Sequence, residues 1–237
     1  MSKLLRPARV LLLGPPGSGK GTQTSRLLKR FGIPGISSGD LLRQQIENKT
    51  EIGRTASAII KEGKLLPDDI MTAVIASELS SRSWLSPTQS FLLDGFPRTE
   101  AQASLLDNSI LSPASAQLNF IVELKVPHEV ILDRIANRLV HVPSGRVYNL
   151  TYNPPKVDGK DDVTGEPLSR RPDDDPEIFR QRLDEYAKLT EPLVDFYKKI
   201  NDSALFSVAG ETSDIIFPQL EKEMIRRFGE RIAETIV

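Results

Sequence analysis

The sequence contains no cysteine, so the chain can form neither a disulfide bond nor a thiolate metal site. No run of apolar residues approaches the roughly 20 that a transmembrane helix needs. Neither sign of charge dominates, because 31 basic and 32 acidic residues leave a net charge of −1. We therefore expect neither a membrane nor a nucleic acid among the partners, since a broad nucleic-acid-binding face needs an excess of positive charge.

Acidic residues are also missing from the amino-terminal segment. The first of them, Asp40, follows seven basic residues, which are Lys3, Arg6, Arg9, Lys20, Arg26, Lys29 and Arg30. A basic segment without acidic residues is typical of a mitochondrial import signal. The alternative is that Lys20 and its neighbours bind phosphate and that the other positions reflect chance. On the first interpretation we expect the protein in the mitochondrial matrix; the alternative location is the cytoplasm.

Short apolar runs alternate with longer segments along the chain, whose 237 residues suit one large domain with small inserted lobes. The runs predict strands at residues 8–13, 33–36, 91–93, 119–126 and 204–208. The intervening segments predict helices at 20–31, 39–82, 127–138 and 213–228, and one that begins at Pro176; the second should break at Gly53, Gly63 and Pro67. This alternation predicts an α/β fold with a parallel five-stranded sheet and helices on both faces.

Residues 139–175 interrupt this alternation. The segment contains eight prolines and glycines and short β-like pieces such as residues 146–148. It is too long for a plain loop, because structureless loops of this length are uncommon inside compact domains. We therefore expect a small inserted lobe with a function of its own.

A glycine-rich turn, residues 14–20 (GPPGSGK), joins the first predicted strand to the first predicted helix. In this context glycines let successive backbone N–H groups turn toward phosphates, and the start of the helix adds partial positive charge. Lys20 supplies a full positive charge for the terminal phosphates of a nucleotide. The turn therefore predicts a phosphate-binding loop (P-loop).

The residue after this lysine departs from the usual pattern. Most phosphate-binding loops place Ser or Thr there to hold Mg²⁺, but this chain has Gly21, followed by Thr22. We expect Mg²⁺ to be held mainly by phosphates and water. Asp94, at the end of the third predicted strand, is the expected carboxylate, acting through water.

Several motifs occur in the same order as in the adenylate kinase family, and they span most of the chain. They are GPPGSGKGT (14–22), SSGDLLR (37–43), GKLLPDD (63–69), LLDGFPRT (92–99), VHVPSGRVYN (140–149) and NPPKVDGKDDVTGEPL (153–168). The chain resembles the long-lid form of this family, and within it the fungal mitochondrial members that use GTP. The resemblance implies a P-loop core (1–36, 67–137 and 175–237), a helical AMP-binding flap (37–66) and a β-rich lid (138–174).

The resemblance also implies the residues of the AMP site. Arg43 and Arg98 should grip the phosphate, because a planar guanidinium suits phosphate oxygens. Gln102 should read the adenine edge, since its amide both donates and accepts hydrogen bonds. The full set is Ser38, Arg43, Lys64, Leu65, Leu66, Gly95, Phe96, Pro97, Arg98, Gln102, Arg171 and Arg182.

On the donor side the resemblance implies a second set of residues. Arg171 and Arg182 should bridge the donor and acceptor phosphates, and Lys20, Arg98 and Arg138 complete the catalytic group. The triphosphate-binding set is Gly17, Ser18, Gly19, Lys20, Gly21, Thr22, Arg134, Arg138, Val147, Tyr148 and Thr212. Val147 and Tyr148 should line the donor base from the lid, and Thr212 should touch it; alternatively Thr212 simply caps the helix that follows.

Some relatives carry four cysteines in the lid and bind zinc there. His141, Ser144, Asp161 and Thr164 stand at the corresponding places in this chain. The resemblance therefore implies a polar network in place of zinc, and we expect no zinc.

The implied function is reversible, Mg²⁺-dependent transfer of the terminal phosphoryl group of a nucleoside triphosphate to AMP by a monomer. GTP is the expected preferred donor, and ATP and ITP are expected as alternative donors. One alternative is an ATP:AMP kinase of the cytosol or the intermembrane space; another is a kinase of UMP. A GTP-binding switch protein would need a guanine-recognition motif. The nearest candidate, residues 48–51 (NKTE), lies too close to Lys20 in a polar segment.

Overall fold

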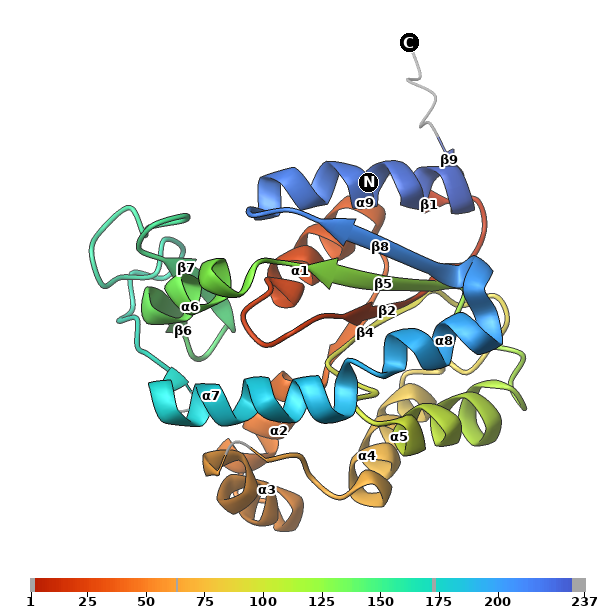
Figure 1. Ribbon diagram of the computed structural model, residues 1–237, viewed down its shortest axis with the longest axis horizontal. Coiled ribbons are helices and arrows are strands. Elements are labelled where there is room, and N and C mark those ends of the chain that lie inside the picture. The colour runs from red at the N-terminus through yellow and green to blue at the C-terminus, as the bar shows by residue number, and fades with distance from the viewer. Residues whose placement is uncertain (1–2, 63, 172–173, 232–237) are drawn as a thin grey trace.

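Five parallel strands form the central sheet, in the order β3-β4-β2-β5-β8 (Figure 1). The computed structural model describes residues 3–62, 64–171 and 174–231. The strands are β2 (Arg9–Leu13), β3 (Gly35–Ser37), β4 (Phe91–Asp94), β5 (Phe120–Lys125) and β8 (Leu205–Ala209). The predicted five-stranded parallel sheet is confirmed, although β3 begins two residues later than the apolar run that predicted it.

Both faces of the sheet are buried, because successive side chains of a strand point to opposite faces. In β2, Val10 and Leu12 pack on one face, whereas Leu11 and Leu13 pack on the other. The first face is covered by α1 (Lys20–Phe31) and α9 (Ser213–Phe228). The second is covered by α4 (Asp68–Ser81), α5 (Glu100–Leu105) and α8 (Leu193–Asn201). Helices on both faces are thereby confirmed.

Two short helices, α2 (Ser38–Glu47) and α3 (Glu51–Lys61), form the segment between β3 and α4. The predicted break at Gly53 is wrong, because Gly53 lies inside α3. The chain breaks earlier, where the side chain of Thr50 accepts a hydrogen bond from the Gly53 N–H (3.0 Å) and caps α3. A Cβ atom on Gly53 would lie 1.9 Å from the Gln45 carbonyl oxygen, so glycine here permits close helix contact. Gly63 lies outside the described residues, and Pro67 precedes α4 as expected.

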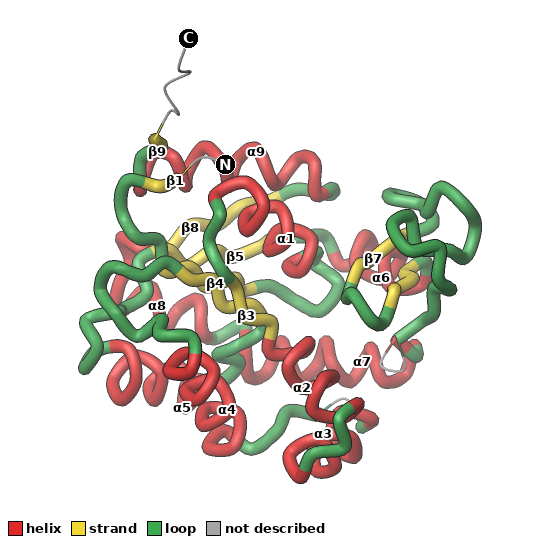
Figure 2. Tube along the Cα trace, turned by 180° about the vertical axis from the view of Figure 1, so that it is seen from behind, coloured by secondary structure: helices red, strands yellow, loops and turns green. Residues whose placement is uncertain are grey.

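The inserted lobe follows α6 (His128–Ala136), which ends slightly before the predicted boundary. Its strands β6 (Arg138–His141) and β7 (Arg146–Asn149) pair in an antiparallel hairpin. Figures 1 and 2 show this lobe beyond the carboxyl end of β5, while α2 and α3 project from another side of the sheet. Both insertions nevertheless begin after the carboxyl end of a parallel strand, since β3 leads into α2 and β5 leads through α6 into β6.

A long helical rod returns the chain from this lobe to the core. It consists of α7 (Pro176–Glu185), the π-helical turn η3 (Tyr186–Thr190) and α8, followed by the 3₁₀ turn η4 (Asp202–Ala204). Asp175 caps α7 by accepting a hydrogen bond from the Glu177 N–H (2.9 Å). A second π-helical turn, η1 (Leu106–Leu111), extends α5. Neither π-helical turn was predicted.

The ends of the described chain also pair. The short strand β1 (Lys3–Leu4) is antiparallel to β9 (Glu230–Arg231), a ribbon that no sequence pattern indicated. Residues 232–237 lie outside the described part. None of the helices in the described ranges has the length and apolarity that a membrane crossing requires.

Candidate active site

The predicted P-loop leaves the carboxyl end of β2 and leads into α1 (Figure 1). Gly17 has a φ of 81°, and a Cβ atom there would lie 2.8 Å from the Ile131 side chain, so only glycine fits without movement. The Ser18 N–H donates to the Pro15 carbonyl oxygen (3.1 Å) and closes the turn. The Ser18 hydroxyl is buried and has no partner among the described residues, which leaves it available to a ligand.

Lys20, the first residue of α1, lies at the centre of the charged groups. Its Nζ donates to the carbonyl oxygens of Gly14 (2.6 Å) and Pro15 (2.9 Å). Burial lowers the pKa of Lys20 to about 8, against the attraction of Asp94, which raises it. Arg98, Arg182 and Arg138 are close enough to lower this pKa further. The structure therefore brings together five of the predicted charged residues from different parts of the chain.

Asp94 ends β4 beside Lys20 and is 8% exposed. Burial raises the pKa of Asp94, whereas the nearby Lys20 charge and a hydrogen bond from Thr24 Oγ1 (3.2 Å) lower it. A Cβ atom on Gly21 would lie 3.9 Å from Asp94 Oδ2, so the missing side chain leaves room beside the carboxylate. Thr24 was not among the predicted residues, although its position four residues after Lys20 puts both on one face of α1.

The turn after β4 and the start of α5 hold several of the predicted AMP-binding residues. The carbonyl oxygen of Gly95 accepts hydrogen bonds from Ser38 Oγ (2.7 Å) and Arg98 Nε (2.7 Å). Gln102, 2% exposed, accepts from the Arg98 N–H (2.8 Å) and donates from Nε2 to Asp68 Oδ1 (2.8 Å). Each end of the amide keeps one further hydrogen-bonding position, which is what an adenine edge needs. Asp68, the partner of Gln102, was not among the residues predicted from the sequence.

The charges of Arg43 and Arg171 both act on Asp40, near the start of α2. Burial raises the pKa of Asp40, but the charges of Arg43 and Arg171 and hydrogen bonds from Arg43 and Ser37 bring it below the ordinary value. Arg43 forms an ion pair with Asp40. The remaining predicted AMP residues differ in exposure. Leu66, Phe96 and Pro97 are buried, Leu65 is half-buried, and Lys64 is exposed and pairs with Glu62 (2.8 Å).

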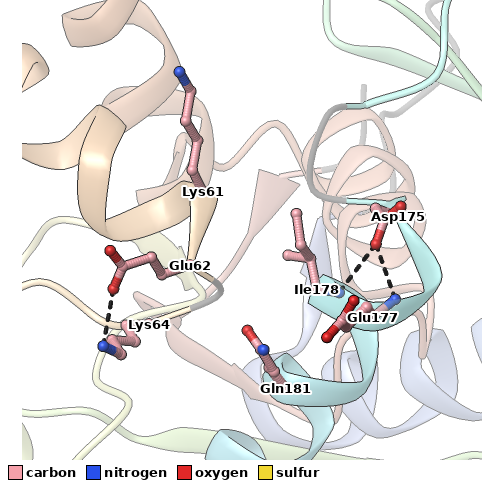
Figure 3. A pocket seen from close by; sticks show the side chains of 7 residues that line it. All are labelled: Lys61, Glu62, Lys64, Asp175, Glu177, Ile178 and Gln181. Carbon is pink, nitrogen blue, oxygen red and sulfur yellow. Dashed lines mark hydrogen bonds and ion pairs between the residues drawn. The ribbon is translucent and has the colours of Figure 1, made fainter.

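A cleft of about 500 Å³ separates α3 and the residues just after it from the start of α7 (Figure 3). Its walls carry Lys61, Glu62 and Lys64 on one side and Asp175, Glu177, Ile178 and Gln181 on the other. In Figure 3 the two walls face each other without a dashed contact between them. The cleft therefore separates the end of α3 from the rod that carries Arg182.

The predicted donor arginines lie at the edge of the inserted lobe. Arg138 forms a two-point ion pair with Asp174, whose side chain is 2% exposed; Nε and Oδ2 are 2.8 Å apart. Arg134 donates from Nη2 to the Glu211 carbonyl oxygen (2.8 Å), and its guanidinium lies 5.9 Å from the centre of the Tyr152 ring. Arg134 thus links α6 to the loop that precedes α9.

The three residues predicted to contact the donor base are placed differently. Thr212 caps α9, because its hydroxyl accepts from the Ile215 N–H (3.3 Å). Tyr148 is 5% exposed, and its hydroxyl donates to Asp161 Oδ1 (2.9 Å). Val147 is 37% exposed. Their contacts with a donor base stay predictions, and the side chains of Thr212 and Tyr148 already have partners within the chain.

The inserted lobe contains the predicted polar network. His141 is bonded through Nδ1 to Ser144 Oγ (2.6 Å), and Asp161 Oδ2 accepts from Thr164 Oγ1 (3.0 Å). Asp161 also accepts two hydrogen bonds from Arg146, 2.7 and 2.6 Å long. Three further residues belong to the network but were not predicted as its members. Arg146 and Tyr148 contact Asp161, and Glu166 contacts His141. The Arg146 contact holds the pKa of Asp161 far below its usual range.

Comparison with known proteins agrees with this geometry. Residues 12–202 match the family model described as adenylate kinase. A mitochondrial GTP:AMP phosphotransferase of Saccharomyces cerevisiae is 58% identical over 231 residues, which are 97% of each chain. Another, from strain S288c of that yeast, is 60% identical over 219 residues, 92% of this chain and 96% of the relative. The chain therefore belongs to the adenylate kinase family.

Proposed function

We propose that the protein transfers the terminal phosphoryl group of a nucleoside triphosphate, GTP in preference to ATP, reversibly to AMP. The convergence of Lys20, Arg98, Arg138 and Arg182 between the P-loop and Gln102 carries this proposal. A triphosphate and the phosphate group of AMP that meet there would find enough positive charge to approach each other. The names of the two yeast relatives support the same reaction.

The reaction needs positioning and charge neutralisation more than a strong base. In the described structure Lys20 donates to the carbonyl oxygens of Gly14 and Pro15, and donor phosphate oxygens would take over those hydrogen bonds. Arg98 and Arg43 would hold the AMP phosphate, while Arg171 and Arg182 would bridge the donor and acceptor phosphates. Arg138, now paired with Asp174, would turn to the triphosphate. These cations stabilise the charge that spreads over the transferred group.

Mg²⁺ is the proposed cofactor. The buried Asp94 carboxylate, with Thr24 on one oxygen and open space at Gly21, fits an ion bound through water to the nucleotide phosphates. The ion would neutralise phosphate charge. The roles of Asp94 and Thr24 are to hold and orient its water ligands.

Residues 37–66 and 138–174 are proposed as a flap and a lid that close over a core made of the remaining segments. Closure would exclude water, which would otherwise hydrolyse the triphosphate. The cleft of Figure 3 supports flap closure, because it leaves space for α3 to approach α7. Within the lid, we propose that the network around Asp161 takes the place of zinc, and elemental analysis of the purified protein should find none.

The protein is proposed to act in mitochondria, as the names of both yeast relatives state for those proteins, and more narrowly in the matrix. The basic amino-terminal segment supports this location. We propose a monomer that binds neither nucleic acid nor membranes. A fluorescent protein fused to the carboxyl end should appear inside mitochondria, and a purely cytosolic signal would contradict this location.

A donor and acceptor comparison tests the proposed reaction. The purified protein should form ADP when AMP is mixed with GTP, with lower kcat/KM values for ATP and little turnover when UMP replaces AMP. Turnover with ATP equal to or better than that with GTP would contradict the donor assignment. GTP binding without AMP-dependent turnover would instead indicate a switch protein.

A further inference from the structure

The π-helical turn η3 interrupts the helical rod between α7 and α8. Its characteristic hydrogen bond joins the Glu191 N–H to the Tyr186 carbonyl oxygen (2.9 Å), five residues earlier. Pro192 follows and has no N–H to donate, so regular α-helical bonding cannot continue there. Isolated π-helical turns within helices are frequent at functional sites. This one has no part in the binding sites described above.

The last residue of this turn, Thr190, reaches the turn that holds Arg98. Thr190 is 7% exposed, and its Oγ1 donates a hydrogen bond to the Arg98 carbonyl oxygen (2.8 Å). Gln102 accepts from the Arg98 N–H (2.8 Å), so the backbone of Arg98 is held on both sides. Gln102 is only four residues from Arg98, whereas Thr190 is 92 residues away. Thr190 therefore ties the backbone of Arg98 to an element that is distant in the sequence.

That element also carries Arg182, eight residues before Thr190 on the same rod. Both arginines lie close enough to Lys20 to lower its pKa. A hydrogen bond from the rod to the Arg98 backbone thus fixes the relative position of two cations that must act on the same phosphates. Misplacement of such groups by a small distance lowers the rate of transfer strongly.

We propose that Thr190 is a positioning residue for phosphoryl transfer, which locks the Arg98 turn onto the helical rod that carries Arg182. The inference rests on the proposed function. Thr190 acts through Arg98 and touches neither nucleotide. The AMP side of the reaction should depend on its hydroxyl, while donor binding should not.

Replacement of Thr190 by valine tests this role, because valine keeps the shape and removes the hydroxyl. The kcat/KM for AMP should fall by about 5- to 10-fold, as expected for one lost hydrogen bond that leaves a buried carbonyl unpaired. The KM for GTP should stay unchanged. Thr190→Ser should restore most of the AMP activity, and Thr190→Ala replaces the valine variant if that variant does not fold.

Thr72 provides a matched control for the loss of a buried threonine hydroxyl. It lies on α4, is 8% exposed, and within the described part of the chain its hydroxyl has no hydrogen-bond partner. Thr72→Val should leave both kinetic constants unchanged. If Thr190→Val behaves like Thr72→Val, Thr190 has no positioning role.

A double-mutant cycle with Arg98→Ala identifies the route of the effect. If Thr190 acts only through Arg98, the double variant should be no worse than Arg98→Ala alone. The proposal would be overturned if the losses of activity in the two single variants multiplied in the double variant. It would also be overturned if Thr190→Val lowered kcat/KM equally for AMP and GTP. A wild-type protein that fails to phosphorylate AMP would overturn the proposed function and this inference together; an active wild type with an unaffected Thr190→Val variant would overturn the inference alone.

Discussion

The Nζ of Lys20 donates a 2.6 Å hydrogen bond to the carbonyl oxygen of Gly14, so the P-loop holds its own lysine over the place where phosphates would bind. Lys20→Ala should fold normally by circular dichroism and lose transfer by roughly 10³-fold or more, because a full positive charge at the terminal phosphates is missing. Lys29→Ala, an exposed lysine of the same helix, is the control. Wild-type turnover in a folded Lys20→Ala variant would refute the assigned role.

The lowered pKa of Lys20 predicts a pH dependence. Burial brings this pKa to about 8, so the free protein carries the charge below that pH and loses it as the pH rises. The kcat/KM for GTP should therefore fall above a pH of about 8. Bound phosphates favour the charged lysine, so kcat should stay level to higher pH. Steady-state rates measured between neutral and alkaline pH give both kcat and kcat/KM. A kcat/KM for GTP that stays level across this range would contradict the prediction.

Arg98 and Arg171 should give different kinetic signatures. Arg98→Ala should raise the KM for AMP far more than that for GTP, because Arg98 lies in the turn beside Gln102. Arg171→Ala should mainly lower kcat, since a bridging arginine stabilises charge that develops during transfer. Arg170→Ala, an exposed neighbour, is the control for the second variant. Parallel rises of both KM values in Arg98→Ala, or an unchanged kcat in Arg171→Ala, would contradict this division of roles.

Local sequence patterns predicted the parts of the site whose geometry is local. The strand, glycine turn and lysine of the P-loop are contiguous, and the alternation of strands and helices places its loop at the carboxyl edge of the sheet. Gly53 misled the prediction, because a glycine can permit close helix contact as well as end a helix. The distinction depends on Gln45, whose carbonyl approaches Gly53 only after the chain has folded.

The partners that orient the site residues could not be predicted in this way. Asp68 contacts Gln102 across 34 residues, Asp174 contacts Arg138 across 36, and Thr190 contacts Arg98 across 92. Nothing in the neighbouring sequence distinguishes these residues from solvated surface residues. Thr24 is the exception, because helical spacing from Lys20 alone brings it to the same face of α1.

The inserted lobe should depend on Asp161 for its stability. The Asp161 side chain is fully buried and accepts hydrogen bonds from Arg146, Tyr148 and Thr164. Asp161→Ala leaves these donors unpaired and should lower the melting temperature by several degrees, while the AMP affinity stays close to wild type. Asp158→Ala removes an exposed aspartate of the same lobe and serves as the control in a calorimetric scan. Equal melting temperatures for the two variants would show that the network has no stabilising role.

The fate of the terminal phosphoryl group tests the central claim most directly. The protein is mixed with AMP, Mg²⁺ and GTP that carries radioactive phosphorus in its terminal phosphoryl group, and the products are separated. Direct transfer predicts that the label appears in the β-phosphate of ADP, in amounts equal to the GDP formed. Label that appears as inorganic phosphate, with no labelled ADP, would contradict the account.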